Sequence, residues 1–366
     1  MRKLILIFVL FFALVTPVCA QDNHYSEYEN IGVEELDDNL NQSVKDFLNE
    51  NDIDVLNSDW VNNLTDKNAL LHIWQFITGG AKNPLKSGVL VAGIIFLSAA
   101  LSAFSGDSRF ETAIYAAVLA VSAVIVGDIW HSISAAVDAV KGCSTFMVGF
   151  IPVFAGIVAL SGRVVTAPAM SALLLGATEV MSYISSFVVL PLISGYLALS
   201  ISSGVSPLLN SSALAENVKK LSQWVLSLLG TLFIGILSIQ TAVNSAADSV
   251  TLRTAKFILG TSVPIAGGVL SEAASTVSAS LGLLKSSVGI YGVVALCLIL
   301  LPIVIELILW RCVLMLDIAL GELFALPKIT SVLRAIDSTL SVLLGVLLTV
   351  GSMFIISLSV VVMATK

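Results

Sequence analysis

The stretch "GIYGVVALCLILLPIVIELILW", Gly289 to Trp310, decides the fold class, because Glu306 is its one charged residue. An α-helix of about 20 apolar residues crosses the hydrocarbon core of a bilayer. Similar runs recur along the chain, which is 57% hydrophobic and 12% charged, with a mean hydropathy of +0.98. A soluble domain carries about twice that share of charged residues. The sequence therefore predicts an all-α, polytopic membrane protein.

About seven spans are expected, within a range of six to nine. Val313–Leu326 is shorter and contains Asp317 and Glu322, so it is a half-span, a re-entrant piece or a bundle-interior helix. Pro168–Ser200 is long and interrupted near Pro191, so it is tilted, kinked or two pieces. Pro-x-x-x-Gly recurs at Pro152, Pro191 and Pro264, which favours broken helices, although both residues are common in membrane helices. The predicted spans are Gly88–Phe104, Thr112–Trp130, Cys143–Ser161, Pro168–Ser200, Trp224–Gln240, Gly289–Trp310 and Ile336–Met363.

The first 20 residues are typical of a secretory signal peptide, with a basic start, an apolar middle and cleavage expected after Ala20. An uncleaved signal anchor is the alternative. If cleavage occurs, the following acidic region lies outside the cell and Gln240–Val288 faces the cytoplasm. Lysine and arginine are balanced between the two sides, so they do not decide the orientation.

Asp22–Asn68 contains 13 acidic and two basic residues. Its apolar residues recur at helical spacing, which predicts one or two short amphipathic helices outside the membrane. These apolar positions are Leu36, Leu40, Val44, Phe47 and Leu48. The region is either a solubilising tail or a docking surface for a partner.

No catalytic constellation occurs, so we expect neither an enzyme nor a cofactor or metal site. Cys143, Cys297 and Cys312 are expected to be inert packing residues. Charges inside apolar runs are costly in lipid and usually face a cavity or a partner. Glu179, in mid-span, is expected to line a channel or to link two helices, and Glu306 and Arg311 to pair one turn apart. Asp128, Glu306 and Arg311 lie near span ends, where their side chains can reach the interface.

Gln240–Lys285 is too polar for a lipid-facing helix and too apolar for a cytosolic loop. Small residues dominate it, and it is predicted to form two amphipathic helices joined by a Pro/Gly turn. Small polar faces suit close helix packing or the wall of a wet pore. With Glu179, the candidate pore, packing or interaction residues are Gln240, Asn244, Asp248, Arg253, Lys256, Pro264, Gly267, Gly268 and Lys285.

This segment resembles the signature block of the stage III sporulation protein AE family. The resemblance rests on Gln240, Ala247-Asp248, Arg253–Phe257, Val263-Pro264, Gly267-Gly268 and "LLKSSVG" at Leu283–Gly289, together with "GFIPVFAGIVALSG" at Gly149–Gly162. "TSVPIAGG" departs from the bulkier run expected there. The resemblance implies a role in endospore formation, in the mother-cell membrane around the forespore. It also implies a trans-envelope, secretion-like channel complex with the other stage III operon membrane proteins and a forespore-side partner.

The sequence divides into five predicted parts. These are a signal peptide (1–20), an acidic extracytoplasmic region (21–87), a first helix bundle (88–240), the amphipathic signature segment (241–288) and C-terminal membrane helices (289–366). Three readings of the function remain open: a pore-forming or permease-like homo-oligomer in the lipid bilayer, a non-conducting scaffold, and a secondary transporter outside sporulation. No reading involves nucleic acid.

Overall fold

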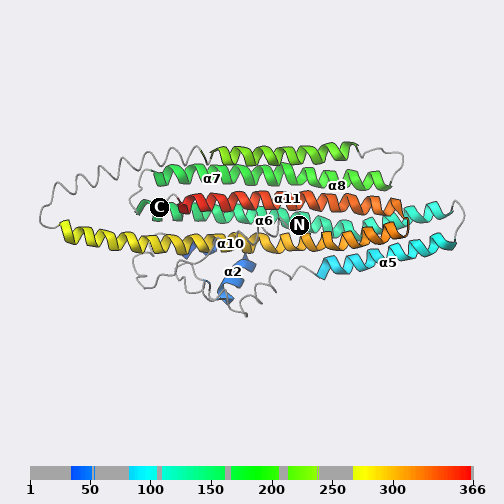
Figure 1. Cartoon of the computed structure of the whole chain (residues 1–366), viewed down its shortest axis with the longest axis horizontal. Helices are drawn as coiled ribbons and strands as arrows, with labels where there is room; N and C mark the ends of the chain where they lie inside the picture. The colour runs from blue at the N-terminus through cyan, green and yellow to red at the C-terminus, as the bar shows by residue number, and fades with distance from the viewer. Residues whose placement is uncertain are drawn as a thin grey trace.

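A computed structural model describes residues 34–51, 53, 82–104, 109–160, 166–205, 213–236, 238 and 267–363. All regular elements in these residues are helices, as the composition predicts. Figure 1 shows an elongated bundle whose long helices lie side by side along the longest axis. In chain order the described helices are η2 (Glu34–Asn39), α2 (Gln42–Glu50), α5 (Lys82–Phe104), α6 (Arg109–Leu160), α7 (Thr166–Ile184), the π-helical η4 (Ser185–Val189), α8 (Leu190–Val205), a helix over residues 213–236, α10 (Gly267–Leu323) and α11 (Pro327–Met363).

Five stretches of the described residues are long and apolar enough to cross a membrane, which agrees broadly with the predicted span count. They are Asn83–Ser102, Ala113–Ala159, Ser171–Ser202, Val288–Leu323 and Pro327–Leu358. The helix over residues 213–236 overlaps the predicted span Trp224–Gln240. The signal peptide, the predicted first signature helix and the Pro264 turn lie outside the described residues.

Two pairs of predicted segments are joined into single helices. Thr112–Trp130 and Cys143–Ser161 both lie in α6, whose 52 residues run through Pro152 and extend for about 78 Å. The connecting residues continue the helix because Ile133, Ala136 and Val140 are buried at helical spacing. Likewise, α10 has 57 residues and includes both Gly289–Trp310 and most of Val313–Leu326. That short segment is therefore the end of a bundle helix, and both helices are longer than one hydrocarbon layer is thick.

The interruption expected near Pro191 is present as a π-helical turn. In η4 the Leu190 N–H donates to the Ser185 carbonyl, five residues earlier, instead of four. Proline has no N–H and crowds the preceding turn. The wider π-turn lies directly before Pro191, and helix continues on both sides of it. Pro168–Ser200 is therefore one modified helical run.

The core lies where α6, α10 and α11 pack together. Phe146, Phe150 and Phe154 form a fully buried aromatic ladder along α6, with ring centroids 5.5 and 5.6 Å apart. Gly292 of α10 faces this ladder, and a Cβ atom there would lie 2.6 Å from both Phe150 Cε2 and Leu358 Cδ1. Glycine thus allows the three helices to approach closely at this level.

A tight turn joins α10 to α11. The Leu326 N–H donates to the Gly321 carbonyl and the Ala325 N–H to the Glu322 carbonyl, at 2.9 and 3.0 Å. This is the Schellman pattern, in which the residue after the helix adopts the left-handed conformation. Ala325 occupies that position with φ of 53°. Pro327 then begins α11, where a missing N–H costs nothing.

Candidate functional site

The predicted signature residues are only partly within the described structure. Gln240, Asn244, Asp248, Arg253, Lys256 and Pro264 lie outside the described residues. Gly267 and Gly268, predicted to form a turn, are the first two residues of α10. Lys285 lies in the same helix, which passes without a break into the predicted span at Gly289. The domain boundary predicted at residue 288 thus falls inside α10.

Glu179 lies in α7, but it is exposed on the bundle surface rather than buried. The Ser144 hydroxyl of α6 donates a long hydrogen bond of 3.4 Å to Glu179 Oε1. One turn before Ser144, the Lys141 ammonium lies 5.7 Å from the ring centroid of Phe187. Glu179 therefore links α6 to α7 weakly while its carboxylate remains accessible.

An exposed polar face on α6 continues this surface. His131, Asp138, Lys141 and Thr145 are exposed and Ser134 is half-buried. They recur every three, four or seven residues, so they share one face over about 21 Å of helix. We call these five residues the α6 polar face. This spacing is visible in the sequence, but the predicted spans end at Trp130 and resume at Cys143, so residues 131–142 are expected to connect two spans and not to form a helix face.

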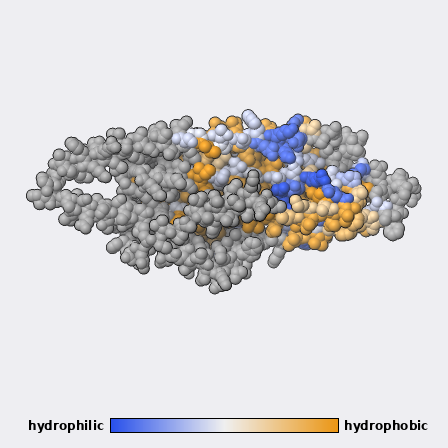
Figure 2. Space-filling model, in the orientation of Figure 1, coloured by the Kyte–Doolittle hydropathy of each residue, from blue (hydrophilic) through white to orange (hydrophobic). Residues whose placement is uncertain are grey.

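Other membrane-length helices expose different chemistry. The exposed large side chains of α5 are Leu85, Val89, Leu90, Phe96, Leu97 and Leu101, a surface that suits lipid. On the face seen in Figure 2, hydrophilic residues gather in two groups to the right of the centre, next to a hydrophobic surface. The exposed charges of α6, Asp138 and Lys141, are unsuited to contact with acyl chains.

Acidic groups inside the bundle accept hydrogen bonds across helices. The Ser87 hydroxyl of α5 donates to Asp128 Oδ2 of α6 at 2.5 Å. One turn along α6, the Ser132 hydroxyl donates to Glu306 Oε1 of α10 at 2.7 Å. Both carboxylates are half-buried. The prediction that Asp128 and Glu306 extend toward the interface is therefore wrong, because each faces a neighbouring helix.

Arg311 pairs with a different residue from the one expected. Its Nε lies 2.9 Å from Asp337 Oδ1 on α11, and Glu306 is held by α6 instead. Arg334 forms a second ion pair across the α10–α11 turn, with Glu322. Lys219, on the helix over residues 213–236, donates to the Ser338 hydroxyl of α11 at 2.8 Å. In the described part of the chain, interhelical contacts therefore satisfy Asp128, Glu306, Arg311 and Glu322.

Asp317 is the exception among those charges. It is 3% exposed, and its Oδ2 atom has no hydrogen-bond partner in the described part of the chain. Cys143 is buried, as expected for a packing residue, whereas Cys312 is exposed, so that expectation is wrong for Cys312. The described residues contain no group of three or more His, Cys, Asp and Glu side chains placed to hold a metal ion.

The described part of the acidic N-terminal region, residues 34–51 and 53, packs against the bundle. All five apolar positions predicted for its helices are buried in the hydrophobic core, with exposures of 6% or less. The prediction of short amphipathic helices is confirmed by η2 and α2. Together these helices, residues 34–50, form the η2–α2 segment, which contacts α6 and α10.

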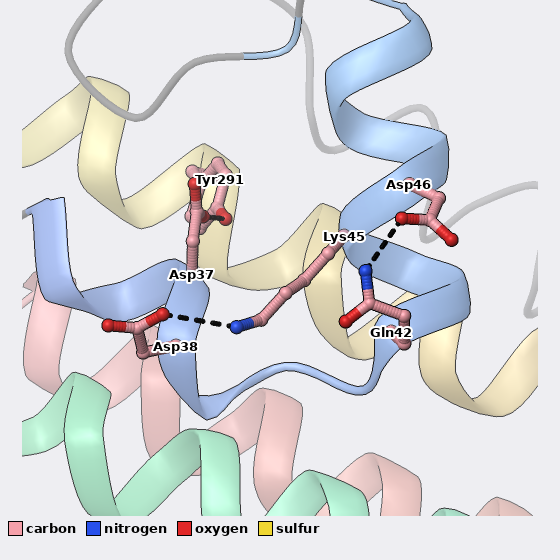
Figure 3. A network of polar contacts seen from close by, with 6 residues as sticks. All are labelled: Asp37, Asp38, Gln42, Lys45, Asp46 and Tyr291. Carbon is pink, nitrogen blue, oxygen red and sulfur yellow. Dashed lines mark hydrogen bonds and ion pairs between the residues drawn. The ribbon is translucent and has the colours of Figure 1, made fainter.

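Polar contacts organise the outer side of this segment. Figure 3 shows Lys45 of α2 directed to Asp38 of η2, with Nζ and Oδ1 3.1 Å apart. Gln42 Nε2 donates to Asp46 Oδ1 at 2.8 Å, one turn further along α2. The Tyr291 hydroxyl of α10 donates to Asp37, which joins the segment to the bundle. The apolar side of the segment thus packs against the bundle, and its polar side carries hydrogen bonds and an ion pair.

Comparison with known proteins identifies the family. The sequence profile of stage III sporulation protein AE matches residues 39–365. The chain belongs to this family. A relative, the stage III sporulation protein AE of Bacillus subtilis (strain 168), is 29% identical over 260 residues, which cover 70% of this chain. The aligned part spans 65% of that relative's length. No solved structure matches the chain.

Membership confirms the resemblance drawn from the signature residues and supports a role in endospore formation. Together with the apolar helices, it indicates a multi-pass membrane protein. The family match begins at residue 39 and includes α2 and every later described helix, so nearly all of the described bundle lies within the matched region.

Proposed function

We propose that this stage III sporulation protein AE family member is a pore-forming component of a trans-envelope channel complex in the mother-cell membrane around the forespore. Its activity in this proposal is conduction and not catalysis. The other stage III operon membrane proteins and a forespore-side protein are the proposed partners. The α6 polar face is the observation that carries the proposal.

Charged groups exposed on a membrane helix favour water over lipid. A charge in hydrocarbon costs several kcal/mol, so such side chains face cavities or polar partners. Asp138 and Lys141 are exposed on α6, and Glu179 is exposed on the adjacent α7. The five residues of the α6 polar face cover about 21 Å of helix, which is about two thirds of the thickness of the hydrocarbon core. A water path along this face therefore crosses most of that layer.

One chain exposes this face on its outside, so a closed pore requires several copies. Closed rotational symmetry brings the same face of each copy to a common axis. In such a ring, α6 lines the lumen, and the apolar residues of α5 contact lipid. The proposed assembly is therefore a homo-oligomer.

Cysteine accessibility tests this arrangement. In full-length protein without native cysteines, single cysteines replace Ser134, Asp138 and Thr145, with Leu97 and Leu101 on α5 as lipid-facing controls. A membrane-impermeant thiol reagent should label the α6 positions and spare the α5 positions. Liposomes containing the oligomer should also release small ions. Labelling of α5 in place of α6, or silent liposomes with intact oligomers, would contradict the proposal.

A non-conducting scaffold is the second candidate. It is favoured by the exposed acidic surface of the η2–α2 segment, where Asp38, Asp46 and Glu50 are all exposed. Charge reversal at these three residues should then reduce capture of a partner subunit from the operon while membrane insertion is unchanged. Unchanged capture would remove this docking role.

A further inference from the structure

The η2–α2 segment has caps and polar pairs of its own. Its helix α2 begins with a side-chain cap, in which Asn41 Oδ1 accepts from the Val44 N–H at 3.0 Å. It ends with Asn51, whose Nδ2 donates to the Phe47 carbonyl at 2.8 Å. Two polar pairs on its surface lie within the segment, Lys45 with Asp38 and Gln42 with Asp46. A segment with its own helix caps and internal polar pairs can leave the bundle and return as one body.

The segment sits at one end of the α6 polar face. A Cβ atom placed on Gly149 would lie 3.4 Å from Asn39 Cβ, so η2 is in direct contact with α6 at this point. Gly149 follows Thr145 by four residues, which places it on the same face one turn later. The Tyr291–Asp37 hydrogen bond holds the other side of η2 on α10. Thus η2 covers α6 one turn beyond Thr145, the last residue of the α6 polar face.

Charge places the segment in water as well. Asp38, Asp46 and Glu50 are exposed, and ionised carboxylates are not stable against acyl chains. The outer side of the segment, next to α6 and α10, therefore faces an aqueous space. This conclusion agrees with an aqueous path along α6 and locates one end of it.

We propose that the η2–α2 segment is an intramolecular cap that closes the Gly149 end of the aqueous path along α6. The proposal rests on the proposed function, because a cap requires a path. Docked, the segment covers Gly149. Undocked, it exposes the end of the α6 polar face. The buried apolar residues and the Asp37–Tyr291 hydrogen bond favour the docked state, and the ion flux through the wild-type protein passes through the undocked fraction.

A reversible cross-link tests the cap in full-length protein without native cysteines. The Cβ separation at Asn39 and Gly149 is close to the range of about 3.5–4.5 Å found in disulfides, and Asn39→Cys removes the amide that a side chain at position 149 would meet. In liposomes, oxidation of the N39C/G149C variant should form the disulfide and abolish ion flux. Reduction should restore the flux. The N39C and G149C single variants should not respond to oxidation.

A second variant moves the equilibrium in the opposite direction. Tyr291→Phe removes the hydroxyl that donates to Asp37 and keeps the buried ring. In this background, N39C should react faster with an impermeant thiol reagent, and flux should rise. Unchanged reactivity and flux would contradict the cap.

The outcomes separate the two proposals. If the disulfide forms and flux continues at the rate of the reduced protein, the cap is refuted and the conducting function stands. If the disulfide does not form, η2 does not dock at Gly149 and the cap is also refuted. If no variant conducts although oligomers are intact, both the cap and the proposed function fail.

Discussion

The close approach of α6, α10 and α11 at Gly292 leads to a specific stability prediction. In Gly292→Ala, the new methyl group would lie 2.6 Å from Phe150 Cε2 and Leu358 Cδ1. Phe150 cannot move aside easily, because it is fully buried and stacked on Phe154. Inserting a methyl group into a packed core costs about 1–3 kcal/mol, and the higher helix propensity of alanine returns about 1 kcal/mol. We expect Gly292→Ala to lower the free energy of unfolding by about 1 kcal/mol.

Gly345 of α11 is the matched control. A Cβ atom there meets no atom within 4 Å, so Gly345→Ala gains helix propensity without a clash. The two variants should then differ by about 2 kcal/mol, or roughly thirtyfold in the folded-to-unfolded ratio. Unfolding of both proteins in the same detergent, followed by circular dichroism, measures this difference. Equal transition midpoints for the two variants would refute the packing argument.

Three further predictions concern the turn and the charges. Ala325→Gly should raise the midpoint of thermal unfolding, because glycine removes about 1 kcal/mol of left-handed strain; a lower midpoint would contradict the Schellman turn. Removal of either partner of the Arg311–Asp337 pair should destabilise the protein, and a double-mutant cycle should give a coupling of up to about 1 kcal/mol, since both side chains are partly exposed; zero coupling would show that they do not pair. Glu179→Gln should leave the unfolding midpoint within about 0.5 kcal/mol of wild type and reduce ion flux through liposomes, whereas unchanged flux would remove Glu179 from the aqueous path.

The mixed outcome for charged residues has a physical explanation. Sequence spacing reveals partners within one helix when residues are three or four apart, but Glu306 and Arg311 are five apart and lie on different faces of α10. Their observed partners lie on other helices: Glu306 accepts from Ser132, 174 residues away, and Arg311 pairs with Asp337, 26 residues away. Which helices are neighbours depends on packing of the whole bundle. Local spacing contains no information about those pairs.

The joined helices have a similar explanation. The polar residues between Trp130 and Cys143 suggested a loop, since a loop and an exposed helix face have similar composition. Ile133, Ala136 and Val140 are buried on the opposite side, which favours a helix over a loop in these residues. The contacts that bury them come from other parts of the chain, so the α6 polar face became recognisable only in the folded bundle.

The sequence alone determined what depends on composition and local spacing. Its apolar content and run lengths predicted an all-α membrane bundle, the signature residues indicated the family, and helical periodicity identified the buried side of the η2–α2 segment. Proline chemistry predicted the interruption that η4 provides. Only the tertiary structure decided that the acidic segment docks on α6 and α10, that Glu179 is exposed, and which helices hold each carboxylate. These features depend on contacts between residues far apart in the chain, and such contacts form only when the helices pack.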